Sequence, residues 1–184
     1  MPVEGGSAVL DACVLVPMPL CDTLLRCAEE PPLYRPLWSE ETLVEVHRTM
    51  QKFGYSVAQA DRRIQTMRAV FPSATIQSNA DSIRRVPDLP DPADRHVVAV
   101  AIKARADAIV TLNLRDFPQH KLRELGLLVQ SPDDFLIGLY NLSAHRVNRV
   151  IEAQKGVSRA SGLDLLARLR HTAPRFVELV SGAG

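Results

Sequence analysis

The stretch that decides the fold is residues 91–112, which read DPADRHVVAVAIKARADAIVTL. Its first part predicts a helix that opens at Asp91-Pro92 and runs to about Ala106, because apolar residues recur there at helical spacing. Its second part predicts a buried strand over Ala108 to Leu112. A helix that leads directly into a buried strand is typical of the α/β fold class.

The flanking sequence extends this pattern in both directions. Ser7 to Asp11 predicts a strand with apolar residues on both faces, as in the interior of a parallel sheet. Ser39 is a good N-cap for a helix whose apolar stripe is Leu43, Val46, Met50 and Phe53. The other expected elements are helices over Pro17–Glu29 and Ser56–Val70, strands over Ala74–Gln77 and Leu127–Gln130, a loop over Val86–Pro92 and a helix that opens at Pro132. This alternation predicts an α/β fold with a mainly parallel sheet.

Length and composition indicate a globular chain with an appended piece. The chain has 184 residues, of which 46% are hydrophobic and 23% charged. From Ser143 onward the pattern is helical only, so we expect a main domain over residues 1–140 and a helical C-terminal extension over 141–184. No apolar run approaches the ~20 residues that span a bilayer. The three cysteines cannot all pair with one another, and we expect buried thiols in a reducing compartment. We therefore expect a cytoplasmic protein with no membrane association.

Charge is unevenly distributed along the chain. The net charge is +1, which does not by itself point to nucleic acid. Residues 140–184 carry seven Lys/Arg and three Asp/Glu, a balance of +4, and the remaining 15 basic and 18 acidic residues give −3. The basic segment is either a surface for phosphates or the solvated side of ordinary helices.

Three aspartates are expected at one edge of the sheet. Asp11 ends the first strand, and Asp116 follows the strand that begins at Ala108. Asp94 shares a helix face with apolar residues that must contact the sheet, so its carboxylate is directed toward the strand ends. Ligands of open α/β sheets bind at this edge. Each aspartate also has a structural interpretation as a helix cap or turn residue, with Asp91 as the better N-cap beside Pro92.

A glutamate could complete a cation site with these aspartates. Glu45 lies on the flank of the Ser39 helix, although Glu41 is one turn away and is an alternative. Carboxylates held close together repel one another unless a cation is present. All-oxygen ligands without a His/Cys cluster favour Mg²⁺ or Mn²⁺ over zinc. We expect His96 to be exposed, because it lies opposite the core face of its helix.

The sequence resembles the PIN-domain nucleases, in particular the VapC-type ribonuclease toxins of toxin–antitoxin pairs. The resemblance rests on four segments, which are Ala8–Ala12, Trp38–Glu45, Asp91–Ala99 and Ile109–Phe117, the last with a Thr-x-Asn-x-x-Asp-Phe motif. It implies a three-layer α/β/α domain with a mainly parallel sheet. It also implies the metal ligands Asp11, Glu45, Asp94 and Asp116, with Thr111 and Asn113 in support.

The function implied by this resemblance is a Mg²⁺- or Mn²⁺-dependent endoribonuclease. The resemblance further implies cleavage to a 5′-phosphate and a 3′-hydroxyl, a small antitoxin protein as partner, and a homodimer. A second hypothesis is a non-catalytic interaction module with the same fold, in which the acidic residues are helix caps and turn residues. Alanine at Asp94 separates the two, since loss of a cap alone costs ~0.5–2 kcal/mol and changes no activity.

Overall fold

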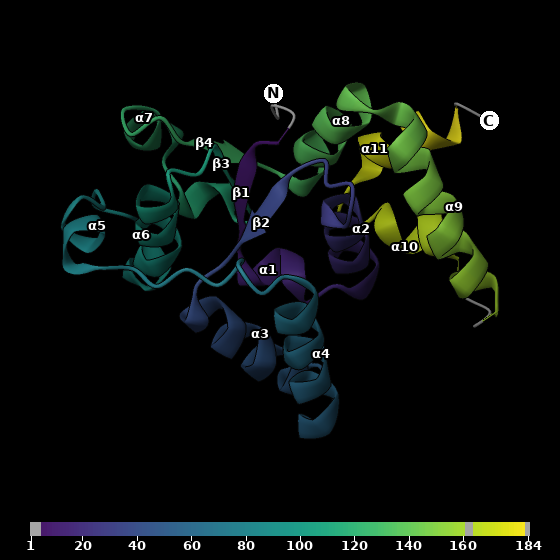
Figure 1. Ribbon diagram of the computed structural model, residues 1–184, viewed down its shortest axis with the longest axis horizontal. Helices are drawn as coiled ribbons and strands as arrows, with labels where there is room; N and C mark the ends of the chain where they lie inside the picture. The colour runs from purple at the N-terminus through teal and green to yellow at the C-terminus, as the bar shows by residue number, and fades with distance from the viewer. Residues whose placement is uncertain (1–4, 161–163, 183–184) are drawn as a thin grey trace.

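The computed structural model describes residues 5–160 and 164–182. In these residues four strands form one sheet, in which every pair of neighbours is parallel (Figure 1). The order across the sheet is β2 (Arg35–Leu37), β1 (Ser7–Leu10), β3 (Ala108–Val110) and β4 (Leu128–Gln130). The register sets Val9 opposite Leu37 on one side and Ile109 on the other. The predicted α/β class with a mainly parallel sheet is confirmed.

Helices cover both faces of the sheet. Val9 and Ile109 pack on one face into a core with α6 (Arg95–Ala104) and α7 (Gln119–Arg123). Ala8, Leu10 and Val110 belong to the core on the other face. The helices on that side include α1 (Ala12–Leu15), α2 (Met18–Ala28) and α8 (Pro132–Leu142). Both faces of β1 and β3 are therefore buried, which gives the three-layer α/β/α arrangement.

A helical hairpin lies beyond the carboxyl edge of the sheet (Figure 1). Its first helix, α3 (Glu40–Lys52), begins after Ser39, whose Oγ accepts a hydrogen bond from the Thr42 amide at 2.8 Å. Gly54 follows with φ +87°, a conformation that suits glycine. Ser56 then opens α4 (Val57–Val70) with a capping box. The local signals in the sequence thus set both ends of α3, and α3 contacts α1 at the strand ends.

Two local predictions are wrong, and two short elements were not predicted. Residues 74–77 form no strand, only an isolated bridge between Thr75 and Trp38. The strand beside β1 is instead β2, three residues that include a proline and so carry no readable alternation. Phe53 is 72% exposed and does not extend the apolar stripe, because α3 ends there and the chain turns. The sequence also did not predict α5 (Ala80–Arg84), which Asn79 caps just before the expected loop.

The C-terminal helices share the core of the sheet's second face. These helices are α9 (Ala144–Ala160), α10 (Leu165–Leu169) and α11 (Pro174–Ser181). Gln154 of α9 is buried; it accepts a hydrogen bond from the Thr23 hydroxyl at 2.9 Å and donates one to Asp22 at 2.7 Å. Residues 161–163 and 183–184 of the expected extension, and residues 1–4 of the expected main domain, lie outside the described residues. The division at 140/141 falls within α8 and stays a prediction.

Among the described helices, none has both the length and the apolar character to cross a bilayer.

Candidate functional site

Asp11 is built into the carboxyl edge of the sheet. Its amide donates to the Val110 carbonyl at 3.1 Å, so the residue continues the pairing of β1 with β3. Its side chain is buried and accepts hydrogen bonds from the Thr111 hydroxyl at 2.7 Å and the Cys13 thiol at 3.1 Å. The Asn113 amide donates in turn to the Thr111 hydroxyl oxygen at 3.0 Å. The Asp11 carboxylate is therefore held in a fixed orientation beside β3.

Asp91 and Asp94 differ in what their carboxylates do. Asp91 caps the short 3₁₀ helix η1 (Pro92–Asp94), because its Oδ1 accepts from the Ala93 amide at 2.8 Å. The Asp94 side chain makes no capping hydrogen bond, although α6 begins directly after it. Burial raises the pKa of Asp94 to about 7, helped by the negative charges of Asp11, Asp91, Asp116 and Glu45. The capping interpretation thus fits Asp91 and does not account for Asp94.

One cavity brings several predicted site residues together. It has a volume of about 280 Å³, and its wall includes Asp11, Glu45, Asp94 and Asn113 from four separate segments. Glu45 is half-buried there, whereas Glu41 is exposed one turn earlier on α3. Asp116, in the 3₁₀ helix η2 (Leu114–Asp116), does not line the cavity. Its charge nevertheless contributes to the raised pKa of Asp94.

His96 is a site neighbour that the sequence did not indicate, and the expectation that it is exposed is wrong. Its side chain is 12% exposed, with Nδ1 2.8 Å from Ser39 Oγ and Nε2 3.4 Å from Glu45 Oε1. The start of α3 covers this side of α6, and the helical pattern of α6 alone could not reveal that contact. Burial lowers the pKa of His96, but the hydrogen bond and charge of Glu45 outweigh it and the pKa is raised.

Three further residues of α3 line the same cavity. They are Arg48, Thr49 and Lys52, which follow Glu45 at offsets of three, four and seven. Such offsets place side chains on one face of a helix. The sequence shows this spacing relative to Glu45. It did not predict that the cations line the cavity, because exposed cations are common on helices.

The donor set of this cavity fits a hard divalent cation. Its anionic groups are carboxylates, with the amide oxygen of Asn113 as a further donor. Burial is the largest cause of the high pKa of Asp94, and the neighbouring carboxylates add to it with a repulsion that a cation would offset. Within the described residues, no three His, Cys, Asp or Glu side chains lie close enough to form a metal-binding cluster on their own. A cation here would therefore take part of its coordination from water or substrate oxygens.

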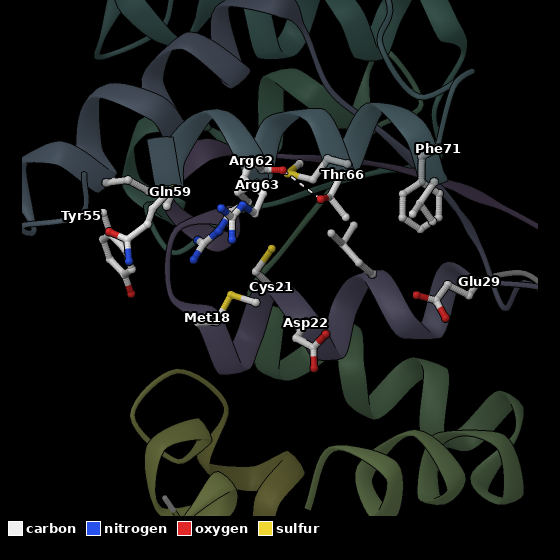
Figure 2. A pocket seen from close by; sticks show the side chains of 14 residues that line it. Met18, Cys21, Asp22, Glu29, Tyr55, Gln59, Arg62, Arg63, Thr66 and Phe71 are labelled. Atoms are coloured by element: carbon white, nitrogen blue, oxygen red, sulfur yellow. Dashed lines mark hydrogen bonds between the residues drawn. The ribbon is translucent and has the colours of Figure 1, made fainter. Parts of the chain in front are cut away.

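A larger cavity lies between α2 and α4 (Figure 2). It has a volume of about 430 Å³ and contains none of the four predicted acidic residues. Asp22 on its wall already accepts hydrogen bonds from Arg26 and Gln154. Arg63 donates to the Val16 carbonyl at 2.8 Å, with its guanidinium 5.5 Å from the centre of the Tyr55 ring. Asp22 and Arg63 are thus engaged in contacts within the fold.

The comparison with known families agrees with this fold. The profile of the PIN domain matches residues 7–115, more than half of the chain. The chain therefore belongs to the PIN domain family. The matched region holds β1, α3, α6 and β3 and with them Asp11, Glu45 and Asp94.

A second similarity covers a shorter part of the chain. Over 58 residues the chain is 41% identical to the "Putative ribonuclease VapC50" of Mycobacterium tuberculosis. The match covers 32% of this chain and 34% of the relative, so it spans about a third of the relative's length.

Proposed function

We propose that this protein is a divalent-metal-dependent endoribonuclease and the toxin of a toxin–antitoxin pair. The observation that carries the proposal is the cavity whose wall includes Asp11, Glu45 and Asp94, with the pKa of Asp94 raised to about 7. Membership of the PIN domain family and the partial similarity to a ribonuclease of the VapC type support it.

In this proposal Asp11, Glu45, Asp94 and Asp116 hold Mg²⁺ or Mn²⁺. Such an ion supplies an activated water and charge stabilisation for hydrolysis of a phosphodiester bond. Thr111 orients the Asp11 carboxylate by donating a hydrogen bond to it, and the Asn113 amide fixes the Thr111 oxygen in turn. His96 holds the Glu45 side chain from the other side through Nε2, and Ser39 Oγ fixes the His96 ring through Nδ1. The chain thus orients its acidic residues before substrate arrives.

The partners follow from the same proposal. The substrate is RNA, and a small antitoxin protein inhibits the enzyme by blocking the acidic cavity. We also propose a homodimer in the cytoplasm; the three free thiols, Cys13, Cys21 and Cys27, suit a reducing compartment.

Cleavage of single-stranded and structured RNA by purified protein tests the activity. Reactions with Mn²⁺, with Mg²⁺ and with EDTA are run beside Asp11→Asn and Asp94→Asn. Asp164→Asn serves as the matched control, because Asp164 only caps α10 and asparagine retains that function. We expect metal-dependent cleavage by the parent and the control and none by the two site variants.

Two other results would contradict the proposal. If all variants cleave RNA equally, the activity is a contaminant and the acidic residues are not the site. If the parent neither cleaves RNA nor binds Mn²⁺ in calorimetry, the protein is a non-catalytic interaction module with a PIN fold.

A further inference from the structure

One face of α3 carries both signs of charge into the acidic cavity. Glu45, Arg48, Thr49 and Lys52 succeed one another along this face and all line the cavity. Glu45 lies near Asp11 and Asp94, and Lys52 is the last residue of the helix. The cations therefore extend along the helix from the position of the acidic residues.

Arg48 and Lys52 differ from Glu40 and His47 of the same helix in having no partner among the described residues. Glu40 forms an ion pair with Arg68, and His47 Nε2 lies 2.9 Å from Asp61. Among the residues that the structure describes, no ion pair or hydrogen bond engages the side chain of Arg48 or Lys52, and both residues are exposed. Like charges four residues apart repel each other on a helix. These two cations are thus free to bind an anion from outside.

Cationic side chains would help an RNA strand to approach the acidic cavity, the one lined by Asp11, Glu45 and Asp94. Carboxylates that suit a divalent cation repel the phosphates of a polyanionic strand. Cations beside them offset that repulsion where the strand must pass. A guanidinium can bind a phosphate through two parallel hydrogen bonds, and an ammonium acts on it as a point charge.

We propose that Arg48 and Lys52 bind backbone phosphates of the RNA strand next to the bond that is cut. This inference rests on the proposed ribonuclease function and assigns the side of the cavity along which the substrate lies, namely the C-terminal half of α3. The two residues are positioning residues, since they hold the substrate and do not act on the reacting phosphate.

An alternative role for the two cations is to balance the charge of the acidic residues themselves. In that case their removal changes metal binding and leaves RNA binding unaltered. If they bind phosphates, their removal weakens RNA binding in a way that depends on salt, because each phosphate contact releases counterions from the strand. The two roles therefore predict different measurements.

The test uses the variant Arg48→Ala/Lys52→Ala, with Lys103→Ala/Arg168→Ala as the matched control. The control removes the same two residue types from exposed positions that do not line the cavity. The probe is a short fluorescein-labelled single-stranded RNA of mixed sequence, titrated in EDTA over a series of salt concentrations. We expect the slope of log Kd against log salt to become shallower by about 1.4, which is two contacts at ~0.7 each. The control keeps the parent's slope.

Cleavage kinetics in Mn²⁺ provide the second measurement. We expect KM for the same RNA to rise several-fold in the double variant while kcat stays unchanged, and Arg48→Lys to retain most of the parent's salt dependence. An unchanged slope and KM would overturn the inference while parent cleavage leaves the ribonuclease proposal in place. In another outcome, the double variant changes only the Mn²⁺ concentration that gives half-maximal rate. That result would show that the two cations balance the charge of the acidic residues, and it would also overturn the inference. A parent that neither binds nor cleaves RNA defeats both proposals.

Discussion

Two helix starts in this protein use nearly the same sequence and have opposite electrostatics. Asp91-Pro92-Ala93-Asp94 opens η1 and α6, and Ser131-Pro132-Asp133-Asp134 opens α8. In both, a capping side chain is followed by proline and then by an acidic residue in the first turn. This arrangement complements the positive end of the helix dipole.

The acidic residues of α8 are neutralised by the fold. Arg175 at the start of α11 forms ion pairs with both Asp133 and Asp134. Hydrogen bonds from Ser131 and Arg175 hold the pKa of Asp134 below its usual value. Asp133 is buried, and its Oδ1 accepts from the Phe176 amide at 2.8 Å. Here the carboxylates fasten one helix to another.

Asp94 has the opposite surroundings. Burial and four neighbouring carboxylates raise its pKa to about 7, and no basic side chain forms an ion pair with it in the described part of the chain. The fold therefore destabilises this charge where it stabilises the charge of Asp134. An aspartate in the first turn of a helix can have a structural or a functional role. Its partners distinguish the two, because a structural carboxylate is paired within the fold and a functional one needs an external cation.

The largest effect is expected from Asp94→Asn compared with Asp91→Asn. Loss of a carboxylate from the proposed metal site lowers cleavage in Mn²⁺ by more than about 100-fold. Asp91→Asn makes the same charge change three residues away and keeps the cap, so its activity stays near that of the parent. Steady-state RNA cleavage measures both. Equal losses in the two variants would show that the two aspartates share one role.

Asp133→Ala probes the neutralised helix start. It leaves the buried Phe176 amide without its acceptor, which costs about 1–3 kcal/mol of unfolding free energy. Urea unfolding followed by circular dichroism measures this loss. Cleavage per folded molecule should not change, because Asp133 does not line the cavity. A loss of activity without a loss of stability would contradict the distinction between the two helix starts.

Asp91→Ala tests capping at the helix start near the cavity. Removal of the Oδ1 that accepts from the Ala93 amide should cost ~0.5–2 kcal/mol of stability. The same urea titration measures it, with Asp91→Asn as the control that keeps the cap. A stability equal to that of the parent would mean that the observed hydrogen bond contributes nothing.

The two helix starts also predict pH effects of opposite sign in metal-free protein. Because the folded pKa of Asp94 is raised to about 7, the folded state binds its proton more tightly than the unfolded state. This destabilising contribution is absent below the unfolded pKa of about 4 and complete above about 7. Asp134 has a lowered folded pKa, so its contribution stabilises above about 4 and is lost as pH falls through the folded value.

Melting temperatures in EDTA across this pH range check the signs. Asp94→Asn should melt above the parent near neutral pH, and the difference should shrink as pH falls toward about 4. Asp134→Asn should melt below the parent near neutral pH, with a difference that also shrinks on acidification. A difference for Asp94→Asn that grows on acidification would refute the assigned direction of its pKa.

The elements with strong local signals could be predicted from the sequence. Ser39 and Ser56 carry their own capping chemistry, and β1 and β3 are runs of buried apolar residues. The strand β2 could not be predicted from the sequence. Its three residues show no hydrophobic alternation, and they form a strand because they pair with β1. In the same way Phe53 follows the local helical spacing, yet the end of α3 leaves it exposed.

The sequence could predict which acidic residues belong to the candidate site, but not how they and their neighbours are arranged around the cavity. Asp11 and Asp94 follow from their places at the strand ends, and the structure sets both on one cavity. Asp116 follows by the same reasoning, but the turn after β3 leaves it off the cavity wall. His96, Arg48 and Lys52 depend on how α3 crosses the sheet edge, which no local spacing determines. That contact belongs to the tertiary structure alone.

The shared core of β1 and the C-terminal helices has a consequence for synthesis of the chain. Ala8 and Leu10 lie in the same core as Phe176 and Val177. A ribosome makes the first strand early and α11 late, so one face of the sheet stays incompletely covered until nearly the whole described chain has emerged. Until then its apolar surface is open to chaperones.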